Sequence, residues 1–198
     1  MNTRTPEYPV DPQFTERWSP RSFTGEAIPA DQLMSLFEAA RWAPSASNTQ
    51  PWRFVYGVAG SPAFEQILAT LANANQLWAC RASALIALVS ATESTPAGAA
   101  QPKPSPQHAF DAGAAWMSLA LQAQRLGWCT HAMGGFDREA LRQVLGVPAA
   151  FAMQCVVAVG RQGEPAALAD EGQRAREAPN GRQPLSAMVA EGRFSFGG

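Results

Sequence analysis

The sequence has little of what would point to a membrane, a nucleic-acid surface or a disulfide framework. Its 198 residues carry a formal net charge of −1 with mixed signs along the chain, which argues against a nucleic-acid or membrane-surface partner. The charge-free apolar run from Ala112 to Gln124 is too short to span a bilayer, and the N-terminus does not resemble a secretory signal. The three cysteines are widely separated and favour a reducing compartment. We therefore expect a cytoplasmic protein with one domain, residues 1–198.

The usual catalytic motifs are also missing. The chain has no Gly-x-Gly-x-x-Gly or Walker-type glycine loop and no Gly-x-Ser-x-Gly elbow, so a Rossmann site, a P-loop site and an acyl hydrolase are not indicated. The two histidines are His108 and His131. Cys129-x-His131 offers too few ligands for a metal ion, so we expect no metal and interpret both residues as buried and structural. Asp111 is best explained as a helix-start residue. Catalysis by side chains alone is poorly supported, and a bound cofactor would have to bring the chemistry.

Apolar periodicity and helix-end signals predict helices that alternate with strands, in an α/β or α+β arrangement. The 110–127 helix is apolar on nearly every face, so we expect it to be buried in a core or between subunits. The proline-rich segment 91–107 is expected to be a loop, of a length typical of a lid or of disorder. We expect residues 1–13 to form an extended arm and residues 161–198 a polar tail that packs on a second subunit. The expected helices are 31–43, 62–81 with breaks, 110–127 and 137–146, and the expected strands are 52–58, 84–89, 128–133 and 154–159.

Two short stretches carry polar side chains that suit a ligand. Arg17, Ser19 and Arg21 alternate, so in an extended segment all three would point the same way. Guanidinium groups match phosphate oxygens, although a solvated basic edge explains the same pattern. After the helix at 31–43, Asn48 and Gln50 offer amide donors and acceptors that suit the edge of a heterocycle. The alternative for that stretch is a turn whose side chains bond their own backbone.

The order of these motifs along the chain is informative. The Arg-x-Ser-x-Arg-x-Phe stretch at 17–23 is followed by a helix and then by Ala-Pro-Ser-Ala-Ser-Asn-Thr-Gln-Pro-Trp at 43–52. Downstream come Asn75-Gln76-x-Trp78, the turn Gly134-Gly135, and Arg182-x-Pro184-Leu185. In this order and spacing the sequence resembles the FMN-dependent nitroreductase family.

The resemblance implies an α+β sandwich with a central, mostly antiparallel sheet flanked by helices, in an intertwined homodimer with two FMN sites at the interface. Arg17 and Arg182 would then hold the phosphate. Ser19 would reach the phosphate or the ribityl chain. The FMN contacts implied in this way come from Arg17, Trp18, Ser19, Arg21, Pro44, Ser45, Ala46, Asn48, Asn75, Gly134, Gly135 and Arg182.

The resemblance divides the flavin ring between two chains. Arg21 and Asn75 would lie near the pyrimidine edge, and the Gly134-Gly135 backbone would face N5 and the dimethylbenzene side. The 44–46 segment, with Asn48 close by, would cover the ring bound to the partner. Two departures remove positive charge, because Asn180 and Trp78 stand where some members carry basic residues, and this should lower the flavin potential.

The implied activity is oxidoreduction. NADH or NADPH would pass hydride to the flavin N5, and a nitroaromatic, a quinone or a similar small acceptor would then be reduced at the same site with ping-pong kinetics. The alternatives are another flavin reaction on this scaffold (enoate reduction, dehalogenation or flavin destruction) and an FMN-binding protein without catalysis.

Overall fold

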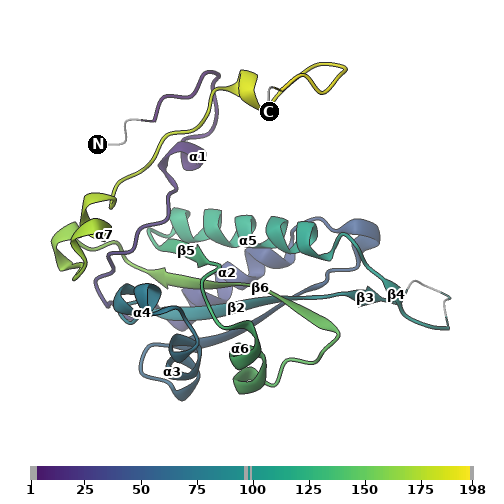
Figure 1. Cartoon of the computed structure of the whole chain (residues 1–198), viewed down its shortest axis with the longest axis horizontal. Coiled ribbons are helices and arrows are strands. Elements are labelled where there is room, and N and C mark those ends of the chain that lie inside the picture. The colour runs from purple at the N-terminus through teal and green to yellow at the C-terminus, as the bar shows by residue number, and fades with distance from the viewer. Residues whose placement is uncertain (1–3, 96–97, 99, 197–198) are drawn as a thin grey trace.

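The core of the protein is a four-stranded antiparallel sheet with helices on both faces (Figure 1). The computed structural model describes residues 4–95, 98 and 100–196. The strand order is β1-β2-β6-β5, and every neighbouring pair runs antiparallel. The strands are β1 (Trp52–Val58), β2 (Ala84–Ala91), β5 (Cys129–Met133) and β6 (Phe151–Gly160). The predicted α+β class, with an antiparallel central sheet flanked by helices, is confirmed.

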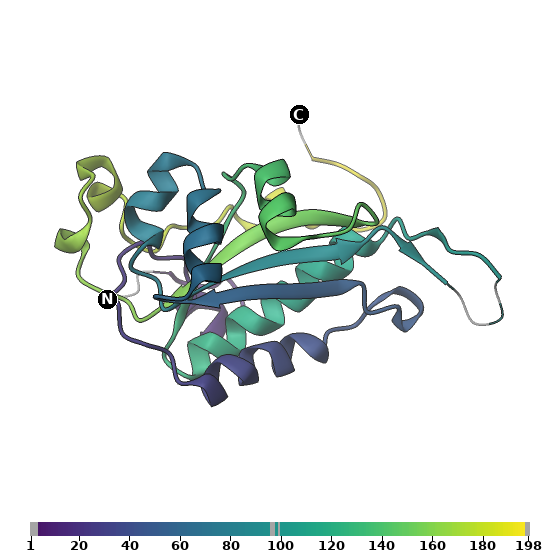
Figure 2. The same ribbon diagram turned by 90° about the horizontal axis from the view of Figure 1, so that it is seen from below.

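Two helical layers cover the sheet, one on each face, as Figure 2 shows from the edge. The alternating side chains of β2 explain both layers, because Ile86 and Leu88 face one cluster of buried residues whereas Leu85 and Val89 face the other. One layer contains α2 (Ala30–Arg41) and α5 (His108–Arg125), and the other contains α3 (Pro62–Ala69), α4 (Asn73–Ala79) and α6 (Arg138–Leu145).

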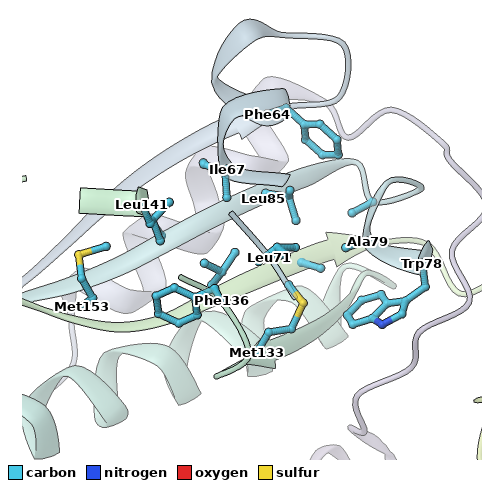
Figure 3. Close-up of a cluster of buried hydrophobic side chains, with 14 of the residues drawn as sticks. Phe64, Ile67, Leu71, Trp78, Ala79, Leu85, Met133, Phe136, Leu141 and Met153 are labelled. Atoms are coloured by element: carbon cyan, nitrogen blue, oxygen red, sulfur yellow. The ribbon is translucent and has the colours of Figure 1, made fainter. Parts of the chain in front are cut away.

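The cluster that contains Leu85 and Val89 packs the short helices α3, α4 and α6 onto the sheet (Figure 3). Phe64 and Ile67 of α3 and Leu141 of α6 lie in this cluster with Leu85 of β2, and all four are almost fully buried. α3 lies so close to β1 that a Cβ built on Gly57 would sit 2.1 Å from the Phe64 backbone nitrogen. Only glycine fits at this contact.

Local end signals were good predictors of the helices. Ser61 caps α3 by accepting a hydrogen bond from the Phe64 N–H, with proline in the first turn. Asp137 caps α6, which ends at Gly146 in the left-handed conformation. The predicted 31–43 helix instead ends at Arg41, two residues earlier.

The long helix and the proline-rich segment differ from expectation. α5 buries one face, and Phe110 on it is 81% exposed, so within this chain it is not buried all round. The 91–107 segment is not a plain loop, because β3 (Glu93–Ser94) and β4 (Lys103–Pro104) pair as a small antiparallel hairpin that projects beyond the sheet (Figures 1 and 2).

The two ends of the chain run together outside the body (Figure 1). The N-terminal arm, with α1 (Pro12–Glu16), lies beside the tail that follows α7 (Glu171–Ala175). Arm and tail line a groove of about 520 Å³. The remaining helices are single 3₁₀ turns at Ala46–Asn48, Pro165–Ala167 and Leu185–Ala187.

Candidate functional site

A cluster of guanidinium groups forms where the arm meets the tail. Arg17 ends α1, and its Nη1 donates to Ser19 Oγ at 3.4 Å. The pKa of Arg17 is lowered by burial, and further by the positive charges of Arg182 and Arg4. Among the described residues, no salt bridge places a carboxylate on Arg17 or Arg182. The structure therefore brings Arg17, Ser19 and Arg182 together, as the sequence predicted, and adds Arg4, which sequence reasoning missed.

Arg21 does not join this cluster as an equivalent partner. The 17–22 segment pairs with no strand, although Arg17 itself has an extended backbone, so a shared face for Arg17, Ser19 and Arg21 stays a prediction. Arg21 instead lies beside a carboxylate, with Nη1 4.0 Å from Glu177 Oε2. Its charge is partly balanced by Glu177, whereas no carboxylate in the described ranges pairs with Arg17.

Glu177 is the main anchor of this segment and was also missed. Its Oε1 accepts hydrogen bonds from the backbone N–H groups of Arg21 and Ser22, both at 2.7 Å. The Glu177 side chain is only 1% exposed, and its Oε2 has no hydrogen-bond partner among the described residues. No local pattern marks such a residue, because its partners lie 155 and 156 positions away in the chain.

Strand β5 contacts the 17–22 segment through His131. His131 Nδ1 is 3.0 Å from the Pro20 carbonyl oxygen, and its ring packs on Trp78 with centroids 4.7 Å apart. Burial lowers the pKa of His131, and the charges of Arg21 and Arg17 lower it further, while the hydrogen bond to Pro20 opposes them. Neutral imidazole is thus favoured, and its Nδ1–H donates to that carbonyl. Trp78 is buried and part of the core.

Cys129 begins β5 close to Arg17. Burial raises the pKa of the Cys129 thiol, which outweighs the opposing influence of Arg161 and Arg17. The thiol is therefore neutral and unreactive near neutral pH.

Within the described ranges, no group of three or more histidine, cysteine or acidic residues could hold a metal ion, and no helix there is long and apolar enough to cross a bilayer.

Asn75 and the two glycines lie together at the start of α4. Asn75 Nδ2 donates to the Gly135 carbonyl oxygen at 3.1 Å. A Cβ on Gly135 would meet that nitrogen at 3.0 Å, whereas one on Gly134 would meet nothing within 4 Å. Gly134 and Gly135 are both exposed. The turn thus presents an open backbone surface, with the Asn75 amide fixed against it.

The 44–48 stretch forms a separate loop. Its backbone has positive φ at Ser47 (50°) and Asn48 (54°), and the Ala46 N–H donates to the buried Asp111 carboxylate at 3.2 Å. Ser45 Oγ accepts from the Gln50 N–H, so the turn alternative describes part of this stretch. Pro44, Ala46 and Asn48 are exposed.

This loop and the arginine cluster lie at opposite ends of α5. Asp111 is in the first turn of α5, whereas Cys129, close to Arg17, lies just beyond its last turn. A helix of 18 residues is about 27 Å long at 1.5 Å per residue. One chain therefore does not bring the 44–48 loop to the arginine cluster. Trp18, predicted at the same site, is half-buried beside the cluster.

Together, the sandwich and the arginine cluster outside its sheet define an α+β protein with a prepared cationic site. Comparison with known proteins identifies the family. The model of the nitroreductase family matches residues 14–59 and 57–161, and the chain belongs to this family.

Two individual proteins are more than 30% identical to this chain over most of its length. An NADH dehydrogenase from Thermus thermophilus is 31% identical over 202 aligned positions, which cover 88% of this chain and 91% of that protein. A crystal structure described as an oxidoreductase containing FMN superposes with a TM-score of 0.95 at 42% identity, covering 100% of this chain and 98% of the other. A nitroreductase family protein from Streptococcus pneumoniae TIGR4 shares the fold alone, with a TM-score of 0.72 and 22% identity, over 90% of this chain and 98% of the other.

Proposed function

We propose that this chain is an FMN-dependent oxidoreductase that takes hydride from NADH or NADPH and reduces a small acceptor such as a nitroaromatic or a quinone. The observation that carries the proposal is the arginine cluster on the nitroreductase fold. Arg17 and Ser19 lie near one end of the chain and Arg182 near the other, and they converge. No carboxylate of the described residues forms a salt bridge with Arg17 or Arg182. Family membership and the 42% identical FMN-containing structure support the same conclusion.

The residues present suit FMN. Guanidinium and hydroxyl groups match a phosphate dianion, and Arg21 and Asn75 would offer donors to the pyrimidine edge. The exposed Gly134-Gly135 backbone leaves room for a flat ring to approach. FMN, when bound, would supply the hydride chemistry at its N5 atom. The chain would bind and orient it, and no side-chain acid or base is required for that step.

We further propose a homodimer. The 44–48 loop lies at the other end of α5 from the arginine cluster, so it would serve the flavin held by a second copy. Large apolar side chains remain exposed along the possible contact surfaces, among them Phe110 on α5, Tyr8 and Phe14 in the arm, and Val189 in the tail. A monomer that retains FMN in light scattering would contradict this arrangement.

The visible spectrum of the purified protein, before and after anaerobic NADH and NADPH, tests the cofactor and the activity together. Bound flavin that the nicotinamide bleaches, and that an acceptor reoxidises, is the expected result. A colourless protein that fails to take up FMN would overturn the proposal. Flavin that neither nicotinamide bleaches would instead indicate a binding protein without this catalysis.

Arg182 gives a direct test of the phosphate contact. Arg182→Ala should weaken FMN binding by about one to two decades, because a hydrogen bond to a charged group contributes roughly 1.5–3 kcal/mol. Arg193, eleven positions further along the same exposed tail, provides the control, and Arg193→Ala should leave the affinity unchanged. Equal FMN retention in both variants would rule out the phosphate role of Arg182.

A further inference from the structure

Arg4 connects the three segments that form the arginine cluster. Its Nη1 donates to the carbonyl oxygens of Thr15 at 3.2 Å and Arg17 at 2.9 Å, which ties the arm to the end of α1. Its Nε donates to the Asn180 carbonyl oxygen at 2.8 Å, which ties the arm to the tail. A second tie comes from Glu7, whose Oε1 accepts from the Leu185 N–H at 2.8 Å. The position of Arg182 relative to Arg17 therefore depends on the arm.

The side-chain oxygen of Asn180 accepts hydrogen bonds from two positively charged side chains. Its Oδ1 accepts from Arg4 Nη2 at 3.3 Å and from Arg182 Nη1 at 3.1 Å. Like charges so close repel each other unless an anion lies between or beside them. Burial lowers the pKa of Arg4, and the charge of Arg182 lowers it further. The pKa of Arg17 is lowered by the same causes. Such a cluster has the charge and the geometry to bind a ligand with two negative charges.

We propose that Arg4 is a positioning residue of the anion site, which fastens the Asn180–Arg182 segment to Arg17 and adds a third positive charge beside the bound phosphate. The ligand class is a phosphate monoester dianion. The inference rests on the proposed function only in that the phosphate is taken to be that of FMN. It has a structural consequence of its own, because an anion that lowers the repulsion among the three guanidinium groups should also hold the arm closed on the tail.

FMN and riboflavin separate this role from a purely structural one, since they differ only in the phosphate. For Arg4→Gln we expect FMN affinity to fall about ten- to a hundred-fold and riboflavin affinity to stay within about two-fold of the parent protein. Arg4→Lys keeps the charge and loses the forked hydrogen bonds, so it should recover part of the FMN affinity. Arg193→Gln is the matched control and should change neither. Unchanged FMN affinity in Arg4→Gln, or an equal loss for both ligands, would overturn the proposal.

A second variant tests the same site without changing Arg4. Asn180→Asp keeps the shape of the side chain but places a negative charge between Arg4 and Arg182. It should weaken FMN binding at least as much as Arg4→Gln and leave riboflavin binding unchanged. An Asn180→Asp protein that binds FMN as the parent does would contradict the anion site.

Chymotrypsin digestion reports on the arm without any flavin. Inorganic phosphate should slow cleavage at Tyr8 and Phe14 in the parent protein and in Arg193→Gln, but not in Arg4→Gln. Equal phosphate protection in all three proteins would overturn the role of Arg4. This readout stands apart from the flavin proposal: if the parent protein fails to bind FMN while phosphate still protects its arm, the proposed function fails and the anion site remains.

Discussion

Replacement of Glu177 should destabilise the fold more than its place near the end of the chain suggests. Its Oε1 accepts two backbone N–H groups at 2.7 Å, and the side chain is 1% exposed. Hydrogen bonds to a charged group contribute roughly 1.5–3 kcal/mol each, and a buried donor left unpaired costs its desolvation. Glu177→Ala should therefore lower the free energy of unfolding by about 3–5 kcal/mol, and Glu177→Gln, which keeps an acceptor oxygen, by about 1–2 kcal/mol.

Thermal unfolding followed by circular dichroism measures the effect, at one protein concentration and without added FMN. In a chain of this size 1 kcal/mol shifts Tm by about 2–4 °C, so Glu177→Ala should lower Tm by about 6–20 °C. Glu65→Ala removes an exposed carboxylate from α3 and should stay within about 0.5 kcal/mol of the parent protein. If Glu177→Ala unfolded within about 2 °C of the parent, the anchoring role of this carboxylate would be refuted.

Three further changes test other parts of the structure. The pKa of His131 lies below its ordinary value of 6.5 because of burial, so the unfolded chain binds more protons below that pH. The urea midpoint should then fall as the pH drops below about 6.5 and fall less in His131→Gln; parallel pH profiles would count against this. Gly57→Ala would place a Cβ 2.1 Å from the Phe64 backbone nitrogen, so it should greatly reduce the soluble yield, and a normal Tm would disprove the close contact. Asp111→Ala removes the acceptor for the Ala46 N–H and should speed FMN release, whereas Asp111→Asn should not; equal release rates in the two variants would rule out this contact.

The fold could be predicted well where the signals are local. Strand β1 was predicted at its observed bounds, and the Ser61 and Asp137 caps correctly marked the starts of α3 and α6. These signals work because a cap or an alternating run is satisfied within a few residues. The hairpin at β3 and β4 was missed because its local signal points the other way: Pro104 lies within β4, and proline argues against a strand.

The site was only partly predictable because its contacts join distant parts of the chain. Arg17 and Arg182 could be chosen from their motifs, and the structure brings them together. The contacts that hold them could not, because Arg4 meets Asn180 across 176 positions and Glu177 meets Arg21 across 156. The alternation of Arg17 and Arg21 could not foretell that the two side chains have different partners, Ser19 for Arg17 and Glu177 for Arg21.

The position of Glu177 explains how the site can depend on ligand and partner. It is the last buried residue in the described part of the chain, and residues 178–196 beyond it are exposed or half-buried. Ordering such a tail costs conformational entropy that no core contact offsets. Among the described residues the Arg4 and Glu7 contacts hold it to the arm, and we propose that an anion between the arginines and apolar contact with a second copy contribute the rest of its order. Ligand binding and dimerisation that draw on the same ordered tail are thermodynamically linked, so each should strengthen the other.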